Sequence, residues 1–248
     1  REEFAKIIKK LNVLTPQYCI AKNYEDIYSY AESAHFPVLV RPSFVLGGRA
    51  MQIVYSKEQL VDYVFRSAEA TNDHPILIDQ FIENAFEFDV DALSDGENVF
   101  VAGIMQHIEE AGVHSGDSSC VIPPYEMSDS VKKDIEDITT KLALELNVIG
   151  LINLQFAVKD QKVYVLEVNP RSSRTVPFVS KYSNIPLASI AAQISVGKKI
   201  TDFNLQKNNF EHIAVKKAVL PFKKFKNEKV FLGPEMKSTG EVMGIDSN

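Results

Sequence analysis

The stretch Lys162-Val163-Tyr164-Val165-Leu166-Glu167-Val168-Asn169-Pro170-Arg171 decides the fold, because it predicts a strand that carries a carboxylate and an amide to its end. Residues two apart on a strand share a face, so Glu167 and Asn169 project together while Leu166 and Val168 can face the core. The proline that follows ends the strand because it has no N–H to donate. One face of this strand therefore carries oxygen ligands.

A hairpin partner is predicted just before this strand. Residues 150–158 predict a second strand, joined to the first by a turn at 159–161, and Gln155 adds a third oxygen donor. Carboxylate and amide oxygens suit a hard cation, Mg²⁺ or Mn²⁺, that keeps open positions for phosphate oxygens. The alternative is a hairpin whose polar residues face water. Arg171 and Arg174 favour the first interpretation, because cations beside metal ligands indicate an anion, as at a phosphoryl-transfer site.

The composition is that of an ordinary globular protein of one or two structural units. The chain has 248 residues, of which 45% are hydrophobic and 24% charged. Lys and Arg number 27 against 33 Asp and Glu, which gives a net charge of −6. This balance argues against general nucleic-acid binding and against binding to an anionic membrane. Any anion site must therefore be local.

The two cysteines, Cys19 and Cys120, are far apart and belong to no Cys/His cluster. We therefore expect structural thiols in a reducing compartment, with neither a disulfide framework nor a zinc site. No apolar run is long enough to span a bilayer, and the first residues lack the apolar region of a signal peptide. A cytoplasmic protein is expected. The sequence does not begin with Met, so we expect it to be a piece of a longer chain.

The first part of the chain predicts a small α+β unit, in which strands and helices alternate. A strand at 36–42 delivers Arg41 to its end, and Gly47 and Gly48 follow in a loop. Paired glycines let backbone N–H groups approach a phosphate, although a pair between strands is most often a tight turn. The other elements expected here are an amphipathic helix ending near Asn12, helices at 24–34 and 56–69, and strands at 17–21, 51–54 and 76–80.

The pattern changes to alternating apolar and acidic residues after Gln80. Residues 81–93 predict a strand with Glu87, Asp89 and Asp91 along one face, and a hairpin turn leads back into a strand at 98–106. Adjacent carboxylates repel one another. The face is therefore either solvated or paired with a partner such as a ribose hydroxyl or a cation, and the spacing leaves both possibilities open.

A polar loop at 112–119 carries His114 among serines. Its N–H and hydroxyl donors suit an anion, although a histidine in a surface loop is usually just solvated. Further elements expected from the same patterns are a long helix at 128–147, helices at 175–182 and 186–196, and a strand at 214–220.

Together these motifs resemble the large chain of carbamoyl phosphate synthase. Residues 45–51 resemble more narrowly its second, C-terminal half, and the likeness covers nearly the whole chain. It implies the α+β ATP-grasp fold, in which two lobes hold Mg-ATP between them, and a reaction in which carbamate attacks the γ-phosphate to give carbamoyl phosphate. The motifs that carry the resemblance are residues 41–51, 87–92, 111–117, 167–171 and 177–181.

The resemblance also implies roles for single residues. Arg171 and Arg174 would stabilise carbamate and the transferring phosphoryl group, while Gln155, Glu167 and Asn169 would hold the divalent ions, with Gln155 and Glu167 also counted in the nucleotide site. The remaining nucleotide-binding residues would be Arg41 at the phosphates, Gly47 and Gly48 in the covering loop, Gln80 and Ile82 at the adenine side, Glu87 at the ribose hydroxyls, and Gly112, Val113, His114 and Ser115 along the site.

The implied organisation is a leading helix at 1–14, a small lobe at 15–80, a large lobe at 81–200 and an extension at 201–248 that leads towards a following domain. Large chains of this family are several times longer. The implied partners are therefore the remainder of the large chain and a glutaminase small subunit, in a glutamine-hydrolysing enzyme that feeds pyrimidine and arginine biosynthesis. Two alternatives stay open: a nucleotide-binding fragment inactive without that remainder, and another ATP-grasp ligase such as a biotin carboxylase.

Overall fold

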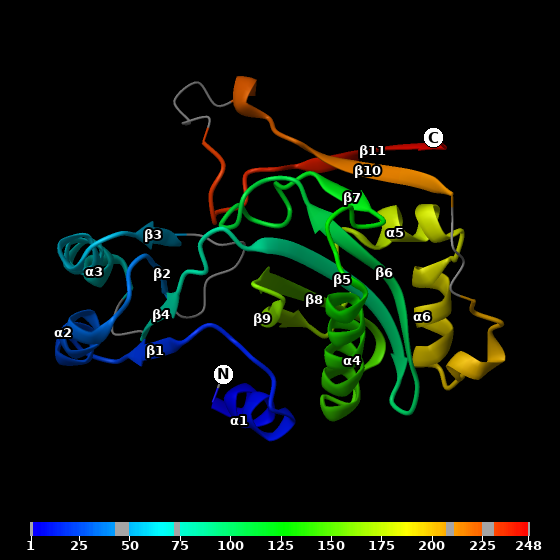
Figure 1. Cartoon of the computed structure of the whole chain (residues 1–248), viewed down its shortest axis with the longest axis horizontal. Coiled ribbons are helices and arrows are strands. Elements are labelled where there is room, and N and C mark those ends of the chain that lie inside the picture. Colours follow the sequence, from blue (N-terminus) through cyan, green and yellow to red (C-terminus); the bar gives the residue numbers. More distant parts are fainter. Residues whose placement is uncertain (1, 43–49, 72–74, 207–210, 225–230, 248) are drawn as a thin grey trace.

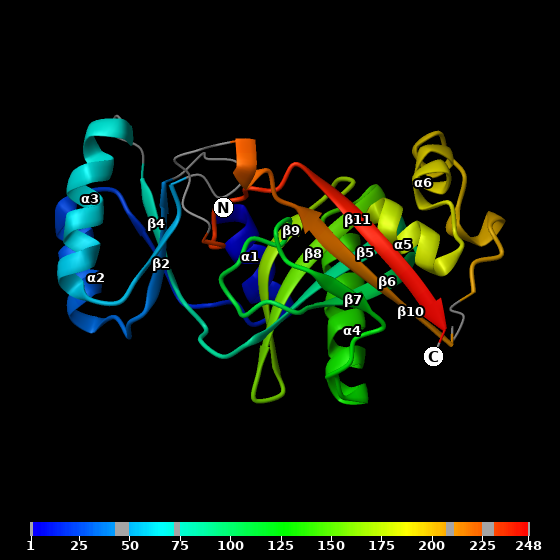
Figure 2. The same cartoon turned by 90° about the horizontal axis from the view of Figure 1, so that it is seen from above.

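The chain folds into two α+β lobes that lie side by side in Figures 1 and 2. The computed structural model describes residues 2–42, 50–71, 75–206, 211–224 and 231–247. Gly47 and Gly48, two of the predicted nucleotide-binding residues, lie outside these ranges. Within the described part, no helix is long and apolar enough to cross a membrane.

The small lobe is an antiparallel sheet of four strands in the order β1-β4-β2-β3, covered on one face by α2 and α3. Val38, Val40 and Ile78 are completely buried beneath these helices. Because side chains alternate along a strand, Arg41 lies on the opposite face. The elements are β1 (Tyr18–Ala21), α2 (Tyr24–Ser33), β2 (Val38–Pro42), β3 (Gln52–Val54), α3 (Lys57–Thr71) and β4 (Ile76–Gln80), close to the predicted bounds.

The large lobe is built on an antiparallel sheet of seven strands in the order β11-β10-β7-β6-β5-β8-β9. One face packs against α1 and α4, and part of the other packs against α5 and α6 (Figure 1). The elements are α1 (Glu2–Leu11), β5 (Phe86–Asp95), β6 (Val99–His107), β7 (Cys120–Ile122), α4 (Asp129–Glu145), β8 (Ile149–Lys159), β9 (Lys162–Asn169), α5 (Val176–Ser183), α6 (Leu187–Ser195), β10 (His212–Val219) and β11 (Gly240–Ser247), with short 3₁₀ helices η1 (Ile200–Asp202) and η2 (Phe222–Lys224).

The leading helix α1 packs with the large lobe. Ile8 is buried in the core beneath α4, and Lys10 Nζ lies 2.7 Å from Glu145 Oε1 at the end of α4. The segment after α1 then crosses β9, where the Val165 N–H donates to the Leu14 carbonyl at 2.9 Å. The chain therefore touches the large lobe before it enters the small one.

The structure corrects two strand predictions. Residues 81–85 do not extend β5 but form the connection between the lobes, where Asn84 adopts a left-handed φ of 56° in a turn. β11 was not predicted, because its sequence contains two glycines and lacks regular alternation. β11 is nevertheless paired with β10 along its whole length and forms one edge of the sheet.

Candidate functional site

A bulge in β9 decides which residues face the site. Gln155 pairs with Glu167 and Phe156 pairs with Val165, so Leu166 is an extra residue on β9. The bulge turns Glu167 out of the core although Val165, two residues earlier, is buried. The prediction that Glu167 and Asn169 project together is confirmed. The prediction that Leu166 faces the core is wrong, because Leu166 occupies the bulge.

The polar residues of three neighbouring strands share one face of the sheet. Asp89, Gln155 and Glu167 form one row across β5, β8 and β9. Asp91, Asn153 and Asn169 form the next row. The helices α5 and α6 pack further along this face, over residues such as Leu93 and Leu151. The two rows of polar side chains form the floor of the candidate site, and the start of α5 reaches this floor where Thr175 bonds to Asp91.

The acidic face of β5 is buried, so the alternative of a solvated face is wrong. Glu87, Asp89 and Asp91 are 6%, 3% and 0% exposed. Their partners come from the protein itself. His107, at the end of β6, places Nε2 at 2.9 Å from Asp89 Oδ2 and Nδ1 at 3.3 Å from Glu87 Oε2. His107 is not among the predicted site residues, because the strand predicted at 98–106 ends one residue before it.

His107 supplies a positive charge between two carboxylates. Burial by itself lowers the pKa of His107, but neighbouring Cys120 and the hydrogen bonds to Asp89 and Glu87 raise it well above its ordinary value. The imidazolium thus offsets one of the two negative charges. This pairing explains how carboxylates can line a buried strand face.

Asp89, His107 and Cys120 are also the one group of at least three acidic, histidine or cysteine side chains in the described residues whose ligand atoms lie within 4.8 Å of one another. This group is poorly suited to a metal ion. Both ring nitrogens of His107 already contact carboxylate oxygens. Lys216 on β10 pairs with Cys120 and is completely buried, which adds a second positive charge. Both cysteines are free thiols, as predicted.

Gln155, Glu167 and Asn169 fit a hard divalent cation better. All three present oxygen atoms on one sheet face. The Gln155 amide nitrogen donates to Glu87 Oε2 at 3.1 Å, which leaves its carbonyl oxygen to act as an acceptor. Asn169 Oδ1 accepts from Arg171 at 3.2 Å, so an arginine lies directly beside the ligand set.

Asp91 ties the arginine-bearing segment to the sheet. It accepts hydrogen bonds from Ser173 Oγ at 2.7 Å, Thr175 Oγ1 at 2.6 Å and Asn153 Nδ2 at 3.1 Å. Burial raises the pKa of Asp91 to about 6, against the effect of these hydrogen bonds. The two hydroxyls flank Arg174, so Asp91 fixes the start of α5 and the backbone that carries this arginine.

The loop at 112–119 lies against the same floor. The Gly112 N–H donates to Glu87 Oε1 at 3.0 Å. Gly112 has a φ of +97°, and a Cβ there would lie 2.9 Å from side-chain atoms of Ile53 and Phe81. Only glycine fits this close approach. Through Ile53, a strand of the small lobe therefore meets the loop of the large lobe.

His114 is held as a neutral donor. Its Nδ1 accepts the Gly116 N–H at 3.0 Å, so the ring proton resides on Nε2. Burial is the main cause that lowers the pKa of His114, which favours this neutral form. Val113 and Ser115 flank it and are half-buried. The loop can thus offer an N–H and a hydroxyl to an anion.

The small lobe contributes Arg41. Its Nη2 lies 3.1 Å from Asp79 Oδ2, while its Nε is buried and has no hydrogen-bond partner among the described residues. A buried donor of this kind lacks an acceptor. Gln80 and Ile82 are half-buried where the chain leaves β4 for the large lobe. These three residues come from the strands and the connection that adjoin the large lobe.

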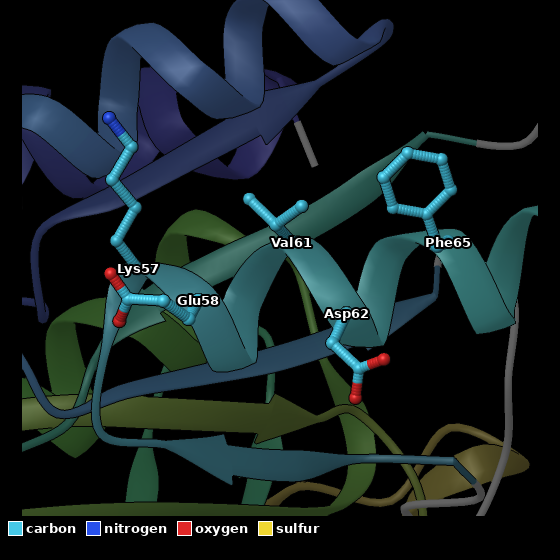
Figure 3. Close-up of a pocket in the computed structure, with 5 residues that line it drawn as sticks. All are labelled: Lys57, Glu58, Val61, Asp62 and Phe65. Carbon is cyan, nitrogen blue, oxygen red and sulfur yellow. The ribbon is translucent and has the colours of Figure 1, made fainter.

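An open hollow on α3 is lined by Lys57, Glu58, Val61, Asp62 and Phe65 (Figure 3). The helix α3 covers the face of the small sheet opposite Arg41. The hollow is therefore separate from the polar floor.

A family model described as the ATP-binding domain of the carbamoyl-phosphate synthase L chain matches residues 1–203. A carbamoyl phosphate synthase large chain from Archaeoglobus fulgidus is 57% identical over 99% of this chain, which spans 23% of that protein. The C-terminal section of such a large chain from Methanocaldococcus jannaschii is 50% identical over the whole chain, which spans 42% of it.

Solved structures share the architecture. The biotin carboxylase domain of 2-oxoglutarate carboxylase from Hydrogenobacter thermophilus, in complex with MgADP and bicarbonate, has a TM-score of 0.72 at 18% identity, covering 89% of this chain and 50% of that one. N5-carboxyaminoimidazole ribonucleotide synthetase, in an ADP complex, has a TM-score of 0.73 at 15% identity over 100% of this chain and 67% of that one. The α+β ATP-grasp fold expected from the sequence is confirmed.

Proposed function

We propose a function from one premise, that the chain belongs to the family of the carbamoyl phosphate synthase large chain. It is the ATP-binding part of the half that phosphorylates carbamate to carbamoyl phosphate. The chain spans 23% of the Archaeoglobus fulgidus relative, so the complete activity belongs to a longer protein. The match to a C-terminal section supports assignment to the second half.

The observation that carries this proposal is that oxygen-bearing side chains lie on one sheet face beside arginine side chains. Gln155, Glu167 and Asn169 would hold Mg²⁺ or Mn²⁺, which neutralises phosphate charge when bound. Arg171 contacts Asn169, and Arg174 follows it in the same segment. Phosphoryl transfer needs positioning and charge neutralisation rather than a covalent nucleophile, and this arrangement supplies both.

The remaining residues would bind different parts of the nucleotide from the two lobes. Arg41 would donate its unpartnered Nε to a phosphate oxygen, and His114 would donate from Nε2. Glu87 would accept a ribose hydroxyl on a carboxylate that also accepts the Gly112 N–H. Gln80 at the end of β4 and Ile82 in the connection between the lobes would adjoin the adenine. Gly47 and Gly48 are proposed as further nucleotide-binding residues and lie outside the described residues.

Arg171 and Arg174 would face the reacting groups. Carbamate is an anion that must approach a negatively charged γ-phosphate, so guanidinium groups beside both lower the barrier by offsetting their repulsion. Asp91 holds the backbone of this segment through two hydroxyls. The backbone that carries Arg174 is thus held in place before the substrate arrives.

The division into a leading helix at 1–14, a small lobe at 15–80, a large lobe at 81–200 and an extension at 201–248 is part of the same proposal. The partners are the remainder of the large chain and, for a glutamine-hydrolysing enzyme, a glutaminase small subunit. A biotin carboxylase function has less support, because the biotin carboxylase domain from Hydrogenobacter thermophilus is only 18% identical to this chain, whereas the Archaeoglobus fulgidus large chain is 57% identical.

Calorimetric titration of this chain with MgADP tests the site. We expect saturable binding that Glu167→Gln weakens about tenfold, because one charged metal ligand becomes neutral. Glu126→Gln is the matched control: Glu126 is exposed, and its N–H bonds to Gln106, whose side chain lies on the other face of β6 from His107. Equal binding by the wild type and Glu167→Gln would contradict the metal assignment.

The second candidate function is a nucleotide-binding fragment without turnover of its own. A reverse-reaction assay distinguishes it from a catalytically active chain. The full-length large chain should form ATP from carbamoyl phosphate and MgADP, and Asn169→Ala should slow this formation. ATP formation by the full-length protein but not by this chain would favour the fragment. If Asn169→Ala formed ATP at an undiminished rate, the assignment of Asn169 as a metal ligand would be wrong.

A further inference from the structure

The C-terminal hairpin of β10 and β11 reaches the candidate site, although it lies beyond the residues matched by the family model, 1–203. The segment that enters β11 runs along the loop at 112–119. The backbone N–H of His114 donates to the Gly233 carbonyl at 2.8 Å, and Lys216 Nζ donates to the Ser115 carbonyl at 3.2 Å. The loop that carries His114 is therefore held from the C-terminal side.

Ser238 joins this loop to an arginine. Its hydroxyl donates to the Gly116 carbonyl at 2.8 Å and accepts from Arg174 Nη1 at 3.0 Å. Ser238 is buried, with 7% of its surface exposed. One hydroxyl thus links three chain segments: the His114 loop, the turn before α5 and the entry to β11.

The backbone at Ser238 is fixed without its side chain. Asp117 is 2% exposed, and its two carboxylate oxygens accept the N–H groups of Lys237 and Ser238, both at 2.8 Å. Loss of the Ser238 hydroxyl would leave these two bonds in place. A change at this side chain can therefore affect Arg174 without releasing the hairpin.

Arg174 is partly exposed, and the other groups near its guanidinium bind it less well than Ser238 does. Its Nη1 also lies 3.0 Å from Met236 Sδ, but a thioether sulfur is a weak acceptor. A Cβ at Gly116 would lie 3.0 Å from Arg174 Nη1 and 3.1 Å from Met236 Sδ. On its other side Arg174 Nε lies 3.6 Å from Glu241 Oε1, an oxygen without a hydrogen-bond partner in the part of the chain that the structure describes. This distance is too long for a hydrogen bond. Ser238 therefore provides the short, directional oxygen contact to the guanidinium.

We propose that Ser238 is a positioning residue for phosphoryl transfer, whose hydroxyl holds the Arg174 guanidinium against the His114 loop. This assignment rests on the proposed function, because it acts through an arginine assigned to the transferring phosphoryl group. A guanidinium fixed in advance costs less to organise in the transition state than one that must be ordered during the reaction. The C-terminal hairpin is then part of the catalytic architecture.

The test uses the full-length large chain and follows ATP formation from carbamoyl phosphate and MgADP. Removing a hydrogen bond to a charged group corresponds to roughly tenfold to a hundredfold in rate. We expect Ser238→Ala to lower kcat by about that factor with little change in the KM for MgADP. Ser238→Thr, which keeps the hydroxyl, should recover most of the rate. Thr239→Ala is the control, because Thr239 is exposed beside Ser238.

The background of Arg174→Ala separates positioning from a general structural effect. If Ser238 acts through Arg174, adding Ser238→Ala to Arg174→Ala should cause almost no further loss. The assignment would be overturned if Ser238→Ala lowered kcat by the same factor in the wild type and in Arg174→Ala, or lowered it in neither.

A readout independent of turnover is the nitrogen-15 NMR signal of the Arg174 side chain in this 248-residue chain. Ser238→Ala should speed rotation of that guanidinium, and Arg174→Lys identifies the signal by removing it. Unchanged rotation would overturn the assignment. If the full-length wild-type large chain forms no ATP, the proposed function is wrong. The NMR comparison would still show whether Ser238 holds the Arg174 guanidinium.

Discussion

Asp91→Asn should remove a pH dependence from the stability of the protein. The carboxyl group is completely buried, and burial raises its pKa from 3.8 to about 6. Between these two values the unfolded chain loses its proton before the folded chain does. The Asp91 contribution therefore favours folding least at high pH, and stability from this group falls as the pH rises from about 4 to 6.

The magnitude follows from the two pKa values. A shift of this size corresponds to about 3 kcal/mol when the group is fully ionised in both states. Between pH 4.5 and 7.5 the expected loss is about 2 kcal/mol, because part of the cost is already present at the lower pH. Asn resembles the neutral acid in shape and lacks the titration. It keeps an oxygen that can accept from Ser173 or Thr175.

The assay is urea unfolding of both proteins at several pH values in this range. The free energy of unfolding of the wild type minus that of Asp91→Asn should fall by about 2 kcal/mol from pH 4.5 to 7.5. Asp160→Asn, in the exposed turn between β8 and β9, is the control. It shows whether the free-energy difference changes with pH for any substitution of Asp by Asn. A difference that stays constant with pH would refute the reasoning, because Asp91 would then titrate alike in the folded and unfolded chains.

Three further substitutions test packing, positioning and capping. Gly103→Ala should lower the free energy of unfolding by about 1–3 kcal/mol and so lower the melting temperature in calorimetry, because its Cβ would lie 2.9 Å from side chains on β7 and α5; an unchanged melting temperature would contradict this packing. Gly116→Ala should fold normally but form ATP about tenfold more slowly, because it displaces Arg174; wild-type rates would contradict this. Ser128→Ala should cost about 1 kcal/mol in urea unfolding, because it removes the side-chain N-cap of α4, which accepts the Val131 N–H; an unchanged free energy of unfolding would contradict this.

The sequence predicts the ends of the strands in the site better than their faces. Glu167 and Asn169 were predicted as a pair, because alternation before a proline is a local signal. The bulge at Leu166 was not predicted, since it depends on the register between β8 and β9. That register is a tertiary property. The bulge changed which apolar residues face the core but left the ligand pair together.

The partners of the carboxylates were harder to predict because they come from distant parts of the chain. His107 lies 18 residues from Asp89, and Lys216 lies 101 residues from the Ser115 carbonyl that it contacts. No local pattern marks either residue. The short strand β7 and the edge strand β11 were missed for a related reason, because they are defined by pairing with neighbours rather than by alternation. Ser238 could be found only once β11 was placed.

The internal ion pairs explain how an acidic sheet face could serve the proposed phosphate-binding site. Unpaired carboxylates at Glu87 and Asp89 would repel a nucleotide, but His107 lies between them and offsets part of their charge. Asp91 is accommodated in another way: burial raises its pKa to about 6, and two hydroxyl donors stabilise the carboxylate that forms above that pH. Glu167, by contrast, is exposed at the end of β9. On the proposed function, Glu167 and the two arginines after it would therefore bind a cation and a phosphoryl group together.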